Sequence, residues 1–165
     1  MKTLLLIRHG KSSWDNTALK DFDRPLNDRG KKNAPEMASR LLKKKIDIDL
    51  FVSSPAKRAK TTAILFAREF KKNEEKIIFE PQLYNADSEN FYDVISKLND
   101  KYKSVAIFSH NPGITDFANL LTEVRTDNIP TCGIFVLQID IENWERFSSG
   151  KKDFIFFDYP KSDAD

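Results

Sequence analysis

The chain has very few of the side chains that build disulfides and metal centres. Cys132 is the single cysteine among 165 residues, which excludes an internal disulfide. Only two histidines are present, and without a cysteine pair a zinc site of ordinary ligand spacing is not expected. We therefore predict a protein that works without a metal or cofactor, in a reducing, cytoplasmic location.

Excess charge of one sign and long apolar runs are scarce as well. The net charge of +2 is too small for a general nucleic-acid footprint. No apolar stretch is long enough to span a bilayer. The first apolar run is too short for a signal peptide, because Arg8 and His9 interrupt it. These absences predict a single domain over residues 1–165, with neither nucleic acid nor membrane as a partner.

Apolar runs bounded by polar residues divide the chain into alternating strands and helices. Strands are expected at residues 4–7, 50–52, 76–79, 104–108, 134–139 and 154–157. Helices are expected after Asn27, which can cap the first of them, from Pro55, after Asn90 and after Gly113. Pro35 lies inside the first helix and should kink it. The alternation predicts an α/β fold, a three-layer α/β/α sandwich around a mostly parallel sheet, with an antiparallel last pair of strands allowed.

Three of the expected strands lead into basic or imidazole side chains. Arg8 and His9 follow the first strand, Arg58 lies in the first turn after the second, and His110 follows the fourth. Because ligands bind at the carboxyl ends of strands in open α/β sheets, we expect these side chains to converge. The two guanidiniums are planar forks suited to the oxygens of a tetrahedral anion. Neighbouring cations would keep His9 neutral, so the pattern predicts phosphoryl transfer through a phosphohistidine at His9.

Three motifs, in this order, resemble the signature of the histidine phosphatase (phosphoglycerate mutase-like) superfamily. They are Arg8-His9-Gly10, then Ser53-Ser54-Pro55 with Arg58-Ala59 and Thr62-Ala63, then Ser109-His110. A longer match, which is similar to the small SixA-type phosphohistidine phosphatases, adds Lys11-Ser12, Trp14, Asp23-Arg24-Pro25-Leu26 and Arg29-Gly30. The resemblance implies a phosphoglycerate mutase-like fold and a metal-independent hydrolase. It also implies that His9 is the phosphoacceptor and that the catalytic phosphate pocket is built from Arg8, Arg58 and His110.

Other residues close to these motifs have two interpretations each. Arg24 either contacts the phosphate or braces the loop, and Ser12 either contacts the substrate or is solvated. Trp14 is interpreted as a packed loop anchor, with docking of a protein substrate as the alternative. Cys132 is interpreted as a small buried residue rather than a nucleophile.

A carboxylic acid is missing from the two positions where many members of the family carry one. Asn111 follows the second histidine, and the loop after the third strand reads Leu83-Tyr84-Asn85-Ala86. Asp87 and Glu89 lie nearby in the sequence and are the candidate acids. A positioned acid contributes about 10² to 10⁴ in rate, and an alkoxide leaving group usually needs one. A phosphorylated imidazole instead takes a proton from solvent at its second nitrogen.

The missing acid therefore favours phosphohistidine as substrate. We predict removal of phosphate from a phosphohistidine of a signalling protein in a phosphorelay, such as a histidine phosphotransfer-type domain. One alternative is a phosphomonoesterase for a small phosphorylated molecule, with Asp87 or Glu89 as acid. The other is a non-catalytic phosphate-binding module.

Overall fold

Six strands form one mixed sheet in the order β3-β2-β4-β1-β5-β6 in the computed structural model, which describes residues 1–160. Their bounds are β1 Lys2–Arg8, β2 Leu50–Ser53, β3 Ile78–Phe79, β4 Ser104–Ser109, β5 Ile134–Ile139 and β6 Lys152–Asp158. The pairs β3–β2, β2–β4 and β4–β1 are parallel. β5 is antiparallel to both β1 and β6. The allowed antiparallel pair is thus confirmed, and the reversal in direction begins at β1–β5.

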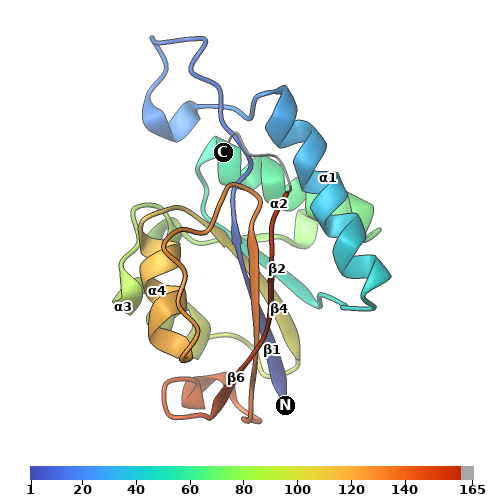
Figure 1. Ribbon diagram of the computed structural model, residues 1–165, viewed down its shortest axis with the longest axis vertical. Coiled ribbons are helices and arrows are strands. Elements are labelled where there is room, and N and C mark those ends of the chain that lie inside the picture. Colours follow the sequence, from blue (N-terminus) through green and yellow to red (C-terminus); the bar gives the residue numbers. More distant parts are fainter. Residues whose placement is uncertain (161–165) are drawn as a thin grey trace.

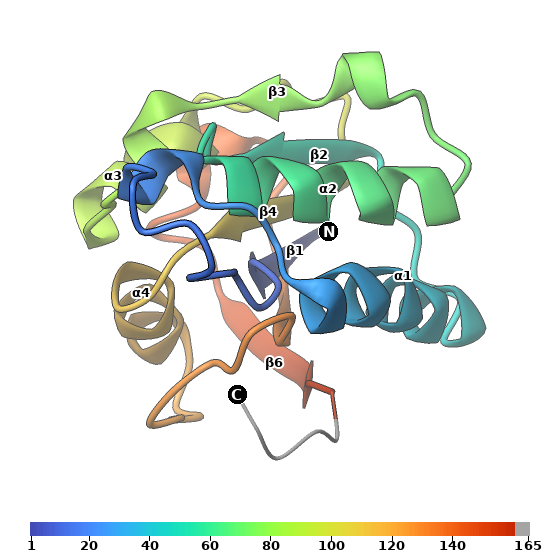
Figure 2. The same ribbon diagram turned by 90° about the horizontal axis from the view of Figure 1, so that it is seen from above.

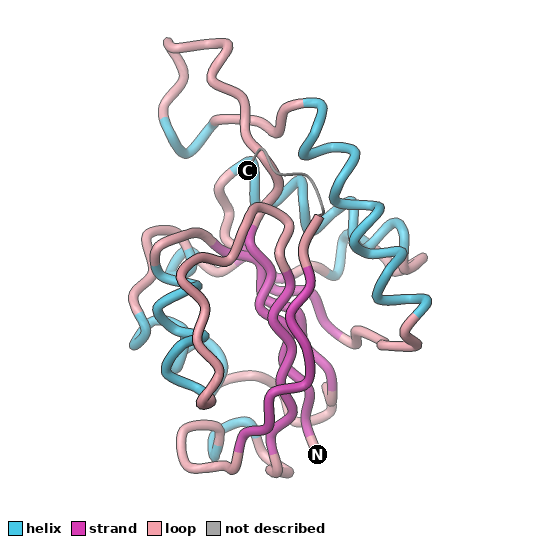
Figure 3. Tube along the Cα trace, in the orientation of Figure 1, coloured by secondary structure: helices cyan, strands magenta, loops and turns pink. Residues whose placement is uncertain are grey.

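Helices cover both faces of the sheet, which confirms the predicted three layers (Figures 1 and 3). The helices are α1 Asp28–Lys43, α2 Lys57–Glu69, α3 Ser88–Ser96 and α4 Gly113–Leu121, with short 3₁₀ turns η1 Asp21–Asp23, η2 Glu74–Lys76, η3 Pro81–Leu83 and η4 Trp144–Arg146. Leu5 and Ile7 of β1 pack in one hydrophobic cluster with α1 and α2. Leu4 and Leu6 pack in a second cluster with α3 and α4. Burial on both faces explains why the first strand reads as an unbroken apolar run.

The first residue of α1 agrees with the sequence prediction, whereas the first residue of α2 lies two positions later than predicted. Asn27 caps α1 as expected, because its side chain accepts a hydrogen bond from the Gly30 amide at 2.9 Å. α1 continues through Pro35 as one helix, so the expected kink does not interrupt it. α2 begins at Lys57 rather than at Pro55, since the preceding residues are held by the Ser54 hydroxyl, which accepts from the Ala56 amide.

The edges of the sheet differ in length. β3 contains only Ile78 and Phe79, because Lys76 belongs to η2. The expectation of a strand over 76–79 was therefore too long. β6 forms the other edge with seven residues and carries Phe154-Ile155-Phe156-Phe157. η4 joins β5 to β6, and Trp144 is fully buried in this connection.

A long loop, residues 9–27, connects β1 to α1 and passes over the carboxyl ends of the central strands (Figure 2). The Ser13 amide donates to the Pro25 carbonyl at 2.8 Å, and the Asn27 amide donates to the Lys11 carbonyl at 2.9 Å. These two bonds pin the outgoing and returning arms of the loop together. Residues far from β1 in sequence are thereby held above the end of this strand.

Two glycines allow the first turn of α1 to pack directly on the backbone that follows His9. A Cβ on Gly10 would lie 3.1 Å from the Gly30 Cα. A Cβ on Gly30 would overlap the Lys11 carbonyl oxygen and lie 2.9 Å from the Lys11 nitrogen. The backbone of Lys11 is fixed by the Asn27 amide, so it has little freedom to move away.

We expect Gly30→Ala to lower the free energy of unfolding by about 1 to 3 kcal/mol, the usual range for overpacking. The loss should occur although alanine favours a helix interior over glycine by about 1 kcal/mol. Urea denaturation measures the change, with Lys31→Ala, an exposed position on the same turn, as control. A Gly30→Ala protein as stable as the parent would show that the Lys11 backbone yields without cost.

Candidate active site

The side chains predicted to converge do meet at the carboxyl ends of the parallel strands. β1 and β4 pair with Arg8 opposite Ser109, so His9 and His110 leave the sheet side by side. Their ring centroids are 5.0 Å apart. Arg58, in the first turn of α2, places its Nε 3.4 Å from the Nε2 of His9.

A cavity of about 240 Å³ lies between these groups and the loop of residues 9–27. It is lined by Arg8, His9, Lys11, Ser12, Trp14, Arg24, Arg58, His110, Asn111 and Thr131. All six residues predicted for catalysis and substrate binding are therefore in one cavity. Its lining residues include no carboxylate. We call this cavity the histidine pocket.

The hydrogen bond of His9 defines which of its nitrogens can react. Nδ1 lies 2.7 Å from the carbonyl oxygen of Gly10, and because a carbonyl only accepts, Nδ1 carries the proton. The lone pair is therefore on Nε2, which faces Arg58. Burial lowers the pKa of His9 well below 6.5, and nearby His110, Arg58 and Arg8 lower it further. His9 is a neutral imidazole with its reactive nitrogen directed at a guanidinium.

His110 is held at one nitrogen and available at the other. Its Nε2 lies 2.8 Å from the hydroxyl oxygen of Ser54. Its Nδ1 is buried and has no hydrogen-bond partner among residues 1–160. Burial lowers the pKa of His110 to about 3, so this ring is neutral too. The sequence placed Ser54 in the second motif but did not predict its contact with His110.

Arginine side chains border the pocket on two more sides. Arg8 donates from one terminal nitrogen to the Ile129 carbonyl at 3.0 Å. Arg24 donates to the Ser13 carbonyl, hydrogen-bonds the Ser12 hydroxyl, and lies over the Trp14 ring, 3.2 Å from its centroid. Arg24 thus braces the loop, as one of its two interpretations has it, and also lines the pocket, while its contact with a phosphate stays a prediction.

Asp21 is the acidic residue next to the site that sequence reasoning missed. Its carboxylate accepts hydrogen bonds from Arg58 at 3.0 Å, Arg24 at 3.1 Å and the Tyr84 hydroxyl at 2.7 Å. The Tyr84 hydrogen bond above all, with those from Arg58 and Arg24, lowers the pKa of Asp21 to about 2. The only signal in the sequence was its position three residues before Arg24.

Three predicted positions differ from their interpretation. Trp14 is 68% exposed, so a packed loop anchor is wrong, because only one face of the ring is covered by Arg24. Asp87 caps α3, accepting from the Asn90 amide at 3.0 Å in a capping box. Glu89 lines a different cavity, beside Tyr92. The structure brings neither acid to the histidine pocket. Cys132 is buried, as expected.

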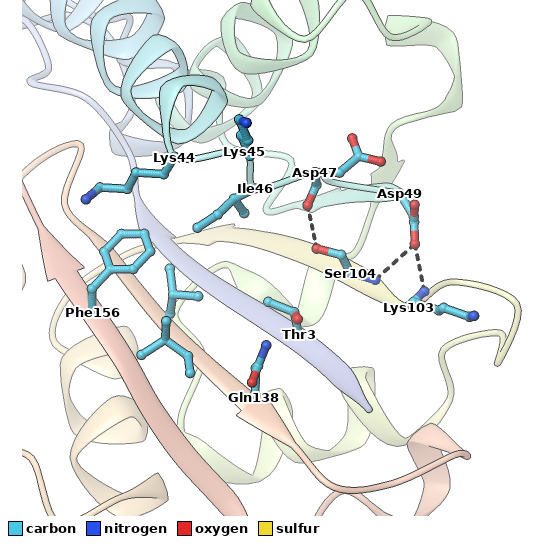
Figure 4. Close-up of a pocket in the computed structure, with 12 residues that line it drawn as sticks. Thr3, Lys44, Lys45, Ile46, Asp47, Asp49, Lys103, Ser104, Gln138 and Phe156 are labelled. Atoms are coloured by element: carbon cyan, nitrogen blue, oxygen red, sulfur yellow. Dashed lines mark hydrogen bonds between the residues drawn. The ribbon is translucent and has the colours of Figure 1, made fainter.

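A second cavity, of about 620 Å³, lies at the opposite end of the sheet, where β1 and β4 begin (Figure 4). Lys44, Lys103 and Phe156 line it, and Asp49 accepts hydrogen bonds there from the Lys103 and Ser104 amides. It contains neither histidine nor arginine. This cavity is larger than the histidine pocket, but it lacks the groups that could bind and accept a phosphoryl group.

Residues 1–160 provide neither a metal centre nor a membrane-spanning helix. These residues contain no group of three histidine, cysteine, aspartate or glutamate side chains arranged to hold a metal ion. None of the helices there has the length and apolar character needed to cross a membrane.

Comparison with known sequences matches residues 4–91, more than half of the chain, to the model of the histidine phosphatase superfamily (branch 1). An uncharacterised chloroplast protein of Arabidopsis thaliana is 29% identical over 153 residues, which cover 88% of this chain and 70% of that protein.

Solved structures share the whole fold. A protein assigned as the phosphohistidine phosphatase SixA of Agrobacterium tumefaciens has a TM-score of 0.78 and 28% identity, over 96% of this chain and 98% of that one. The protein histidine phosphatase SixA complexed with tungstate has a TM-score of 0.81 and 23% identity, over 95% and 96% of the two chains. Since the family match includes the strand that delivers His9 and the helix that delivers Arg58, this chain belongs to the histidine phosphatase superfamily.

Proposed function

We propose that this protein is a phosphohistidine phosphatase that moves a phosphoryl group from a histidine of a partner protein to His9 and releases it as inorganic phosphate. One observation carries the proposal. A neutral imidazole faces guanidinium groups in a small pocket that has no carboxylate among its lining residues. The structural likeness to SixA proteins supports the same substrate class.

In the first step, the lone pair on Nε2 of His9 attacks phosphorus and the P–N bond of the substrate breaks. The substrate ring, protonated at its other nitrogen by solvent, takes the bonding electron pair and leaves as neutral imidazole. Positive charge then develops on the His9 ring. The Gly10 carbonyl, which accepts from Nδ1, is placed to stabilise this charge.

In the second step, water attacks phosphorus and the bond to Nε2 breaks, which returns the electron pair to His9. One proton of the water stays on the phosphate and the other goes to solvent. Arg8, Arg58 and the free nitrogen of His110 would hold the phosphoryl oxygens through both steps. An ion pair at 4 Å is worth about 4 kcal/mol at an effective dielectric constant of 20, so cations at this distance stabilise the transferred group strongly.

The acid–base character of the site favours a P–N over a P–O substrate. Asp21 is the carboxylate bonded to Arg58, and a pKa of about 2 keeps it ionised at neutral pH. Its oxygens already accept hydrogen bonds from three side chains, so it is a poor proton donor. An alkoxide leaving group would depart slowly here, because no acid is placed to protonate it. A protonated imidazole needs no such acid.

The rim of the histidine pocket supports a protein as the substrate. Trp14 is 68% exposed, and Leu19 and Phe22 are each 37% exposed on the same loop. Single exposed apolar side chains are ordinary, but three within nine residues of one loop, with Trp14 lining the pocket, are typical of a contact surface. A phosphorylated histidine phosphotransfer-type domain in a cytoplasmic phosphorelay would fit this surface.

We expect single-turnover release of phosphate from a phosphohistidine protein to be at least about 100-fold faster than from a simple sugar phosphate, because only the second needs an acid. His9→Ala should abolish release, and the substrate without enzyme corrects for its own hydrolysis. Comparable turnover of the sugar phosphate would contradict the substrate assignment. Binding of vanadate without release from any substrate would instead identify a phosphate-binding module.

The lowered pKa values predict that neither histidine titrates between pH 8 and pH 6. An untagged protein labelled at histidine gives two imidazole signals in an NMR titration, and His9→Asn and His110→Asn assign them. A pKa below the ordinary value means that the neutral ring persists as the pH falls through 6.5. The unfolded chain does take up protons there, so stability should decrease below pH 6.5. A titration midpoint near 6.5 for His9 would contradict a permanently neutral nucleophile.

Trp14→Ala should reduce kcat/KM about tenfold more for a phosphohistidine protein than for phosphorylated imidazole, because only the protein can cover the indole. A tenfold loss corresponds to about 1.4 kcal/mol, within the range for an exposed aromatic side chain at an interface. Leu120→Ala, which removes an equally exposed apolar side chain from α4, is the matched control. Equal losses on both substrates would argue against docking through Trp14.

A further inference from the structure

Asp21 connects three segments that border the histidine pocket. Its backbone carbonyl accepts from Arg58 of α2 at 2.7 Å, and its Oδ2 accepts from the same guanidinium at 3.0 Å. Oδ2 also accepts from the Tyr84 hydroxyl at 2.7 Å, and Oδ1 accepts from Arg24 at 3.1 Å. One residue at the start of η1 thus joins α2, the returning arm of the loop and the segment after η3.

The guanidinium of Arg58 is divided between Asp21 and His9. Both terminal nitrogens donate to Asp21, while the Nε–H faces the Nε2 of His9. The edge of the guanidinium that carries the Nε–H is thereby turned toward His9. A phosphoryl group must lie on this side to react with Nε2 of His9. The contact with Asp21 orients Arg58 without using the Nε–H, which is directed at His9.

Arg24 is fixed in the same way by several partners at once. Besides Asp21, it contacts the Ser13 carbonyl, the Ser12 hydroxyl and the Trp14 ring. Two cations beside one small pocket repel each other, and a carboxylate between them offsets this repulsion. Holding a long arginine side chain in one rotamer costs conformational entropy, and the contacts with Asp21 mean that this cost is met before the substrate binds.

We propose that Asp21 is a positioning residue, which holds the guanidiniums of Arg58 and Arg24 in the geometry that receives the phosphoryl group and is itself held by Tyr84. The proposal rests on the proposed function in so far as phosphoryl transfer is the reaction. It does not depend on whether the substrate bond is P–N or P–O, because both substrates present the same phosphoryl oxygens to Arg58.

The test is Asp21→Asn, which keeps the shape of the side chain and removes its charge and one acceptor. We expect kcat/KM to fall about 10- to 100-fold, as misplaced catalytic groups do, with the same loss on a phosphohistidine protein and on p-nitrophenyl phosphate. The dissociation constant for inorganic phosphate should rise in parallel. Asp23→Asn, a carboxylate in the same η1 turn that makes none of these hydrogen bonds, is the control and should retain parental activity.

A double-mutant cycle separates positioning from a general structural effect. Because Asp21 positions both arginines, Asp21→Asn should cost less in an Arg58→Ala background than in the parent, and less than threefold when Arg24→Ala is added as well. Urea denaturation of each variant confirms that the fold is retained.

Full additivity in this cycle, or parental kcat/KM for Asp21→Asn, would overturn the positioning role. A parent enzyme that hydrolyses p-nitrophenyl phosphate but no phosphohistidine would overturn the proposed substrate, and the positioning role would then be judged on p-nitrophenyl phosphate.

Discussion

The parallel pairing of β1 with β4 is the constraint on which the rest of the site depends. Its register sets Arg8 opposite Ser109, and the two histidines follow at the next position of each strand. A slip of one residue would turn every side chain of one strand to the other face of the sheet. Both strands are buried between helix layers, so the register is strongly fixed by packing.

Burial of these two strands also determines the chemistry at their ends. The histidine rings emerge from the core rather than from the surface, and burial is the largest influence that lowers the pKa of each. The same apolar runs that build the sheet therefore keep the imidazoles neutral. Arg24 and Arg58 are as deeply buried as the two histidines, and the carboxylate of Asp21 pairs with both guanidiniums.

Much of this arrangement was predictable from the sequence, because it is encoded locally. Apolar runs gave the central strands, and the place of Arg58 in a first helical turn followed from the strand before it. The roles of Ser54 and Asp21 were not predictable, since they depend on contacts between segments 56 and 37 residues apart. The path of the loop over residues 9–27 has no periodicity from which such contacts could be inferred.

Two interpretations of single side chains were wrong or unsupported for different physical reasons. Trp14 was expected to be packed because large aromatic side chains usually are, but Arg24 covers just one face of its ring. Asp87 carried a visible cap signature, with Asn90 three residues later, and the structure uses it as a cap. A carboxylate that caps a helix is not available as a catalytic acid. The hydrogen bond from the Asn90 amide shows that Asp87 serves as the cap.

The long outer strand of the sheet has a consequence unrelated to catalysis. β6 has β5 as its one hydrogen-bonded neighbour among residues 1–160, so a row of its backbone amides and carbonyls is left without a strand partner. Its centre is Phe154-Ile155-Phe156-Phe157, a sequence favourable for cross-chain β-pairing. Lys152 and Asp158 place opposite charges at its two ends, and charged residues on an edge oppose such pairing. The charged residues at the two ends of β6 therefore oppose aggregation along this edge of the sheet.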